Sequence, residues 1–415
     1  MSAETEALSR ERARDVLDSL AARLRAPDAL RPERADSLAF GHPGIALLFT
    51  TLAAGGDTEA RAVAHAHLAA AIRPVGGLRA SGLYGGAAAV AFAARHAATG
   101  PDAYRSLLDA LTPRVAGAAL LRARALRARR AAGTGAPSHL YDTVSGLSGL
   151  ARLLLALDPH GPAVRECLEA LVDLAEPAVT AHGTLPGWWT ADAPGPRGPS
   201  PDYPKGHLNL GLAHGIPGPL ALLAVAHEQG VRVRGQEEAI GRVAGWLIRQ
   251  AREGAQGTYW PLAVRAEDEL GGERSPNPPT RDAWCYGPPG VARALFLAGR
   301  ALNERGWRES AARSLRATLA RPSGPRALEG RGLCHGTGGL LHIAARMAYD
   351  LEDAEMAGQL PYLAGQLVSH DPAGGAGFLD GEAGAALALH TYVEGGAGLA
   401  MEPEVLGWEA ALLLG

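Results

Sequence analysis

The chain has 415 residues, of which 47% are hydrophobic and 20% are charged, a balance that excludes a largely disordered protein. The 40 basic and 43 acidic residues leave a net charge of −3, which gives no basic surface for nucleic acid. The N-terminus carries no signal-peptide pattern, and no apolar run reaches the length of a membrane span. We therefore expect a cytoplasmic protein without an integral membrane segment.

A short small-residue turn recurs seven times along the chain, each time before an apolar segment. The turns are Gly41–Gly44, Gly85–Ala88, Gly146–Gly149, Gly215–Gly218, Gly287–Gly290, Gly336–Gly339 and Gly381–Gly384. Glycine allows backbone angles that other residues avoid, and proline fits the first turn of a helix. The spacing of the turns suits two helices and two loops per repeat.

The segments between these turns alternate in character. Those directly after a turn, such as Ile45–Phe49 and Leu340–Ala344, are almost wholly apolar, which is typical of helices buried on all sides. The segment from Pro162 to Ala175 instead has one apolar stripe at helical spacing. The alternation predicts an inner ring of helices surrounded by an outer ring. We find no convincing strand pattern.

Two proline-rich stretches interrupt the helices, at residues 183–206 and 264–280. Neither can be a regular helix throughout. Because both lie just upstream of turns with reactive residues, they are candidates for walls or lids of a site. Variable surface insertions are an equally good interpretation.

The three cysteines differ in their surroundings. Cys285 immediately precedes the turn at Gly287, and Cys334-His335 precedes the turn at Gly336. If all turns lie at the same end of a ring, these residues meet, and two thiolates with one imidazole satisfy three of zinc's four positions. A single cysteine is commonly a buried apolar residue, but the repeated placement favours ligands. Cys167, on an apolar stripe, is predicted to be core.

Three more ionisable residues lie near the turns: Asp142, His214 and Arg281. Each also has an ordinary structural interpretation, as a helix N-cap, a hydrogen-bonded histidine and a salt-bridge partner. Their convergence on one rim favours a functional role. His42 and His207 lack this support, so we expect them to be solvated or structural.

Taken together, these motifs resemble the lanthionine synthetase C-like family, the zinc-dependent LanC cyclases. The specific pieces are Tyr141-Asp142 with Gly146–Gly149, Leu212-Ala213-His214-Gly215, Arg281 with Trp284-Cys285-Tyr286-Gly287, and Cys334-His335-Gly336. The resemblance covers essentially the whole chain, because all seven turns occur in order. Ala88 departs from the family's glycine, which puts only local helix packing in doubt.

The resemblance implies an all-α fold, an α/α toroid in which seven helical hairpins form a double ring, as a single domain over residues 1–415. It also implies one Zn²⁺ per chain. The zinc ligands that it implies are Cys285, Cys334 and His335. The positions that match catalytic residues of the family are Asp142, His214, Arg281 and Tyr286.

The family's reaction is the addition of a peptide cysteine thiol to a dehydroalanine or dehydrobutyrine in the same peptide, which closes a lanthionine or methyllanthionine ring. The implied substrate is a dehydrated precursor peptide with leader and core. The chain shows no kinase-like or lyase-like region and so resembles a free-standing cyclase. A separate dehydratase and a transporter complex are then the expected partners.

The residue chemistry suggests roles for these groups but leaves alternatives open. Attack on the β-carbon generates an enolate, whose oxygen Arg281 or Tyr286 could stabilise. His214, oriented by Asp142, is our choice as general acid and could also act as base to the incoming thiol.

Other functions fit the sequence less well. A zinc prenyltransferase needs an aromatic lipid tunnel, and the chain has only 5 Phe. A glycosidase needs a carboxylate pair, for which only Asp142 and Asp282 are obvious. The alternative of another class is a non-catalytic or glutathione-binding LanC-like scaffold. Eukaryotic relatives of that kind tend to have histidine after the first zinc cysteine, so Tyr286 favours the cyclase.

Overall fold

The computed structural model describes residues 3–30, 34–73, 78, 81–194, 200–255, 257–271, 275, 280–322, 324–370, 375–395 and 406–415. These residues fall into two compact units. Unit 1 comprises Met1–Arg114 and Pro322–Trp408, and unit 2 comprises Val115–Arg321 and Glu409–Gly415. Within the described ranges, no helix is both long enough and apolar enough to cross a membrane.

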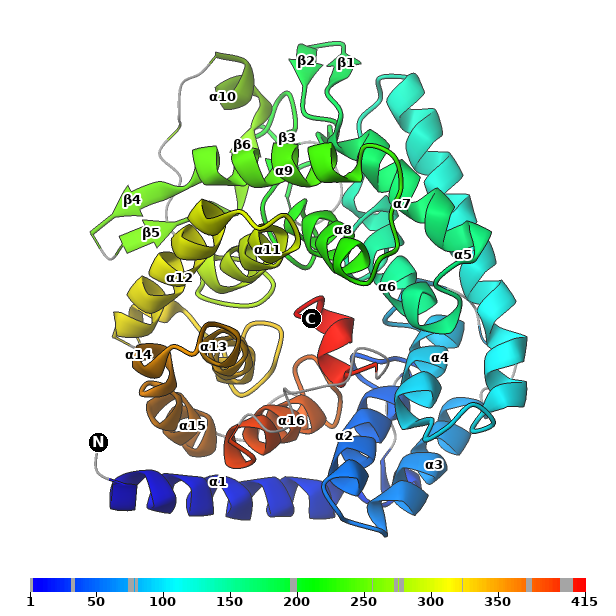
Figure 1. Cartoon of the computed structure of the whole chain (residues 1–415), viewed down its shortest axis with the longest axis vertical. Helices are drawn as coiled ribbons and strands as arrows, with labels where there is room; N and C mark the ends of the chain where they lie inside the picture. The colour runs from blue at the N-terminus through cyan, green and yellow to red at the C-terminus, as the bar shows by residue number, and fades with distance from the viewer. Residues whose placement is uncertain are drawn as a thin grey trace. The chain divides into compact units, whose positions relative to one another are not determined.

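Helices build unit 1 (Figure 1). Its elements before the boundary are α1 (Ala3–Leu24), η1 (Pro27–Ala29), α2 (His42–Ala54), α3 (Ala60–Ala71) and α4 (Gly86–Ala97). Its later elements are η3 (Gly324–Arg326), α13 (Thr337–Leu351), α14 (Ala354–Ala357), α15 (Leu360–Ser369) and α16 (Glu382–Val393). Two unit boundaries fall inside α5 (Arg105–Ala131) and η5 (Trp408–Leu412), and the third lies between Arg321 and Pro322.

Unit 2 combines helices with short strands. Its helices are η2 (Ser138–Leu140), α6 (Leu147–Leu157), α7 (Pro162–Ala175), α8 (Pro217–Glu228), α9 (Gln236–Gln250), α10 (Ala266–Gly271), α11 (Pro288–Ala301) and α12 (Arg305–Ala320). Its strands are β1 (Ala178–Thr180), β2 (Gly183–Leu185), β3 (His207–Asn209), β4 (Arg252–Gly254), β5 (Gly257–Tyr259) and β6 (Ala263–Arg265).

Each predicted turn starts a helix, as the sequence indicates. The helices that follow the seven turns are α2, α4, α6, α8, α11, α13 and α16. In α8 every residue from Pro217 to His227 is buried, and in α16 every residue from Ala383 to Val393 is buried. Ala88 is fully buried within α4, so the departure from glycine leaves that helix intact. The predicted buried helices are confirmed.

Helix α7 illustrates the predicted one-sided helices. Its apolar stripe, which includes Val164, Cys167 and Leu171, is buried, and the helix packs against α6 and α9. Its charged face binds Arg127 of α5 through three carboxylates, those of Glu166, Glu169 and Asp173. Burial raises the pKa of the Cys167 thiol to about 12, so it stays protonated at neutral pH. Its predicted place in the core is confirmed.

The sequence has no convincing strand pattern, yet the structure contains a few short strands. Within the described residues of unit 2, three antiparallel pairs form: β1 with β2, β3 with β6, and β4 with β5. Each strand is three residues long, which is too short for an alternating pattern to stand out in a sequence. Pairing partners such as Asn209 and Ala263 are also far apart along the chain, so no local signal announces them.

The two predicted interruptions contain some regular structure. Strand β2 lies at the start of 183–206, α10 lies within 264–280, and β6 overlaps the start of the second stretch. Residues 195–199, 272–274 and 276–279 of these stretches lie outside the described residues. Their predicted role as walls or lids stays a prediction.

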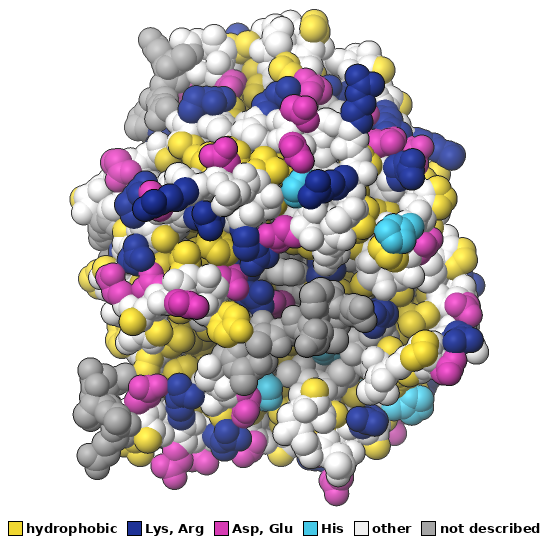
Figure 2. Space-filling view, viewed as in Figure 1, with side chains coloured by type: hydrophobic (Ala, Val, Ile, Leu, Met, Phe, Trp, Pro, Cys, Tyr) yellow, Lys and Arg dark blue, Asp and Glu magenta, His cyan; other side chains and the backbone are white. Residues whose placement is uncertain are grey.

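The surface carries charges of both signs. Figure 2 shows basic and acidic side chains interspersed over this face, as the nearly balanced charge counts lead one to expect. Some form ion pairs, such as Arg23 with Glu382 in unit 1 and Arg300 with Glu228 in unit 2. Exposed pairs of this kind contribute little to stability.

The turns fold back onto the loops that precede them. A Cβ atom at Gly146 would lie 2.2 Å from the backbone nitrogen of Asp142 and 2.6 Å from that of Tyr141. Hydrogen bonds hold this contact, from Ser148 N to Tyr141 O at 3.1 Å and from Gly149 N to Asp142 O at 3.4 Å. Only glycine allows the two backbone segments to approach so closely.

We predict that Gly146→Ala lowers the free energy of unfolding by about 1–3 kcal/mol or more, because the added methyl group collides with backbone that cannot move independently. Gly241→Ala is the matched control, since no atom lies within 4 Å of a Cβ at this position in α9. It should stabilise the protein by ~0.5–1 kcal/mol through helix propensity. Urea unfolding measures both, and equal effects would contradict the proposed contact.

Candidate active site

Asp142 has two roles in unit 2. Its side chain is 2% exposed, and Oδ1 accepts hydrogen bonds from the backbone nitrogens of Ser145 (2.6 Å) and Gly146 (2.7 Å) at the start of α6. Oδ2 accepts a hydrogen bond from Nδ1 of His214 at 2.7 Å. Asp142 is not the N-cap of α6, which is Gly146; one of its oxygens instead holds the turn before the helix, and the other holds His214.

The turn that carries His214 is locked to the turn that carries Asp142. The backbone nitrogen of Thr143 donates to Ala213 O at 3.2 Å, and the Thr143 hydroxyl donates to Leu212 O at 2.7 Å. The side chain of His214 is 43% exposed. Because a carboxylate accepts the Nδ1 proton, Nε2 remains as the nitrogen that can give or take a proton.

The pKa of His214 is raised from its ordinary value. Burial acts to lower it, but the hydrogen bond and the charge of Asp142, together with the charge of Cys285, outweigh the burial. More of the imidazole is therefore protonated near neutral pH than in a free histidine. Such a group is suited to act as a general acid.

Tyr286 and Asn209 form a second polar pair in unit 2. The side-chain amide of Asn209, in β3, donates to the hydroxyl of Tyr286 at 3.1 Å. The ring of Tyr286 packs so closely on the backbone of Gly211 that a Cβ there would lie 2.5 Å from Cε1. Asn209 was not among the site residues predicted from the sequence. The available signal was a lone amide among apolar residues, in Leu208-Asn209-Leu210.

The loop from Arg281 to Gly287 presents Cys285 before α11. Cys285 is 5% exposed, and its carbonyl accepts a hydrogen bond from Ala213 N at 3.4 Å. Arg281 is half-buried. Its carbonyl oxygen would lie only 1.9 Å from a Cβ atom added at Gly287. Gly287 has a φ of +107°, which favours glycine.

Asp282, in the same loop, has a structural role. It is buried and pairs at 2.6 Å with buried Arg321, which directly follows α12, and Arg321 also donates to Thr258 O at 3.1 Å. A carboxylate committed to a buried ion pair is poorly placed to act as a catalytic acid or base. This pairing weighs against a glycosidase with Asp142 and Asp282 as its two carboxylates.

In unit 1, Cys334 and His335 lie in the loop before α13. The backbone nitrogens of Leu333 and Cys334 donate to Leu379 O at 2.6 and 2.9 Å, which ties this loop to the one before α16. Nδ1 of His335 lies 3.5 Å from Oδ1 of Asp380, and Nε2 lies 3.7 Å from Oε2 of Glu329.

Asp380 and Tyr84 were missed in the sequence, although a signal for both was present. Each immediately precedes the first glycine of a turn, which is also the place of His214, Tyr286 and His335. Burial, followed by the negative charges of Cys334 and Asp380, raises the pKa of Tyr84 well above its ordinary value. Tyr84 therefore remains a protonated phenol in this electronegative part of unit 1.

Three of the predicted residues offer atoms of the kind that bind a metal ion. Cys285 of unit 2 and Cys334 and His335 of unit 1 each supply one such ligand atom. Two thiolates and one imidazole form a donor set that suits zinc and leaves one tetrahedral position for another ligand.

The two histidines set aside in the sequence are structural, and the solvated alternative was wrong. His42 is buried, with Nδ1 3.0 Å from Nδ1 of His67, and the Nε2 atom of His67 lies 2.8 Å from Leu24 O. His207 is buried in β3, with Nδ1 2.6 Å from Asp192 O.

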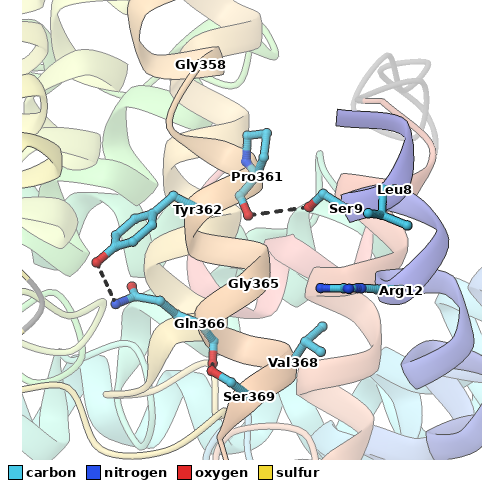
Figure 3. Close-up of a pocket in the computed structure, with 10 residues that line it drawn as sticks. All are labelled: Leu8, Ser9, Arg12, Gly358, Pro361, Tyr362, Gly365, Gln366, Val368 and Ser369. Carbon is cyan, nitrogen blue, oxygen red and sulfur yellow. Dashed lines mark hydrogen bonds between the residues drawn. The ribbon is translucent and has the colours of Figure 1, made fainter. Parts of the chain in front are cut away.

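A largely apolar groove in unit 1 lies apart from these residues. Figure 3 shows it between α1 and α15, where Ser9 donates to Pro361 O at 3.5 Å and Gln366 donates to the Tyr362 hydroxyl at 3.2 Å. None of the predicted catalytic or metal-binding residues lines it.

The chain is similar to known proteins. The family model for lanthionine synthetase C-like protein matches residues 32–401. The chain belongs to the lanthionine synthetase C-like family. Nisin biosynthesis protein NisC of Lactococcus lactis subsp. lactis is 26% identical over 324 residues, which cover 76% of this chain and 75% of NisC.

A solved structure shows the same fold. The structure titled nisin cyclase matches with a TM-score of 0.78 at 23% identity and covers 97% of this chain and 96% of its own. The prediction of an all-α protein of the α/α-toroid class is thereby confirmed.

We predict that Asp142→Asn lowers the pKa of His214, because the substitution removes the charge that outweighs burial. The Asn oxygen can still accept hydrogen bonds from the nitrogens of Ser145 and Gly146, so the fold should persist. NMR titration of the imidazole measures the pKa, and an unchanged value would contradict the assigned cause.

The raised pKa of His214 should also make the stability of the protein depend on pH. A raised folded-state pKa contributes stability below the unfolded pKa of about 6.5, and this contribution is lost as pH rises through the folded value. The free energy of unfolding of the wild-type protein should therefore exceed that of Asp142→Asn by more at about pH 5.5 than at about pH 8.5.

Proposed function

We propose that this chain is a zinc-dependent lanthipeptide cyclase that forms lanthionine and methyllanthionine rings. Membership of the lanthionine synthetase C-like family and the similarity to NisC support the reaction class. The observation that carries the proposal is the His214–Asp142 pair, whose imidazole is within electrostatic reach of Cys285. A purely structural zinc site has no need of such an acid–base pair.

The donor set of Cys285, Cys334 and His335 fits one Zn²⁺ with an open position. When bound, the ion would lower the pKa of a substrate cysteine from about 8.5 and hold it as a thiolate.

The chain's own residues would stabilise the negative charge of the enolate and supply the proton to its α-carbon. The thiolate sulfur bonds to the β-carbon of the dehydroamino acid, and the electron pair of the C=C bond moves toward the carbonyl oxygen. Arg281 or Tyr286 would stabilise that oxygen. Nε2 of His214 would then protonate the α-carbon, while Asp142 holds Nδ1. One proton moves from sulfur to carbon, so the peptide mass is unchanged.

The substrate and partners follow from the same proposal. The substrate would be a dehydrated precursor peptide with leader and core, supplied by a separate dehydratase, and a transporter complex would handle the product. We propose a cytoplasmic location and a single domain over residues 1–415, with the stretches 183–206 and 264–280 as walls or lids of the site.

The direct test is to incubate the purified protein with a dehydrated, cysteine-containing peptide. We expect the free thiol to disappear without a change of mass, as measured by alkylation and mass spectrometry. Zinc content alone cannot separate a cyclase from a glutathione-binding scaffold, since both would hold the metal. A zinc-loaded protein that leaves the thiol free would contradict the cyclase and favour the scaffold.

Two substitutions should separate metal binding from acid–base chemistry. Cys334→Ala should lose stoichiometric zinc, measured by metal analysis, and with it ring closure, because a ligand is missing. His214→Asn should keep its zinc and slow ring closure by about 10²- to 10⁴-fold, the usual effect of losing a general acid. An unchanged rate in His214→Asn would remove this histidine from the mechanism.

A further inference from the structure

We propose that Asn209 is a positioning residue that directs the hydroxyl of Tyr286 toward the reacting peptide. The inference rests on the proposed cyclase function and on contacts that lie within unit 2. It assigns a role to a side chain that would touch no substrate itself and would act through the tyrosine.

A backbone group fixes the orientation of the Asn209 amide. The nitrogen of Gly211 can only donate, and it lies 2.9 Å from Oδ1 of Asn209. The amide oxygen must therefore face Gly211, which leaves the amide nitrogen facing the Tyr286 hydroxyl at 3.1 Å. The direction of this hydrogen bond, from Asn209 to Tyr286, follows from the backbone.

This direction decides what the tyrosine can do. The phenolic oxygen accepts from Asn209, so the phenolic proton is not used in that bond and can be donated to another acceptor. If the proton shifts toward an enolate oxygen, the Asn209 amide also stabilises the charge that develops on the phenolic oxygen. Asn209 therefore favours Tyr286 as a donor to the oxyanion.

The surroundings hold Asn209 rigidly in this position. Its side chain is buried, and its strand β3 pairs with β6, where Asn209 is opposite Ala263. Its carbonyl accepts a hydrogen bond from Ile216 N at 3.1 Å, two residues after His214. One residue therefore fixes both the hydroxyl of Tyr286 and the turn that carries the imidazole.

Asn209→Asp is the sharpest variant, because it keeps the shape and the acceptor for Gly211. The second carboxylate oxygen would accept a hydrogen bond from the Tyr286 hydroxyl, so Tyr286 would no longer donate that hydrogen bond to the substrate. We expect kcat for ring closure to fall by about 10- to 100-fold with little change in KM, as for loss of a group that acts mainly in the transition state. Zinc content should match that of the wild-type protein.

Gln236→Glu is the matched control, because it also replaces a buried side-chain amide with a carboxylate, away from Tyr286. Gln236 also accepts from a backbone nitrogen, that of Val233 at 2.9 Å, and donates to Leu223 O at 2.8 Å, at the start of α9. It should lower thermal stability while leaving kcat within about twofold of the wild type. This control separates loss of stability from loss of positioning.

A double-mutant cycle with Tyr286→Phe tests whether Asn209 acts through the hydroxyl. If it does, adding Asn209→Asp to Tyr286→Phe should lower kcat by less than about twofold beyond the effect of Tyr286→Phe alone. Independent, multiplying losses would overturn the inference, as would a wild-type kcat in Asn209→Asp. Failure of the wild-type protein to close any ring would instead overturn the proposed function, and the inference with it.

Discussion

Close backbone contact between turns and the loops that precede them is the constraint on which the candidate site depends. A Cβ at Gly290 would lie 2.3 Å from Trp284 O, one at Gly339 would lie 2.0 Å from Leu333 O, and one at Gly384 would lie 1.9 Å from Phe378 O. Backbone groups cannot give way as side chains can. The residue before each turn is therefore held in a fixed place, and these are the places that carry the candidate catalytic and metal-binding groups.

At Asp142 one carboxylate both holds the turn before α6 and binds the candidate catalytic histidine. Three donors, the nitrogens of Ser145 and Gly146 and the Nδ1 of His214, stabilise a charge that would otherwise be costly to bury. Because the backbone nitrogens of Ser145 and Gly146 hold the carboxylate at the turn before α6, the imidazole is oriented by a fixed group. A flexible aspartate would give His214 the same partner without the same precision.

Much of the site could be predicted from register along the chain. Cys285, Cys334, His335 and His214 lie at or next to the position before a turn glycine, and a repeat brings equivalent positions to equivalent places. Asp380 and Tyr84 occupy that position too and could have been found by the same rule. Asn209 could not, because its role depends on strand pairing and on an amide orientation that no spacing encodes.

The sequence by itself determined where the buried helices begin, which faces of the outer helices are apolar, and that Cys167 is core, because helical period and turn chemistry are local properties. Tertiary structure alone decided the pairing of β3 with β6, the ion pair that occupies Asp282, and the burial of His42 and His207. These features arise between residues far apart in the chain. Their energies depend on packing and desolvation, which a linear pattern does not contain.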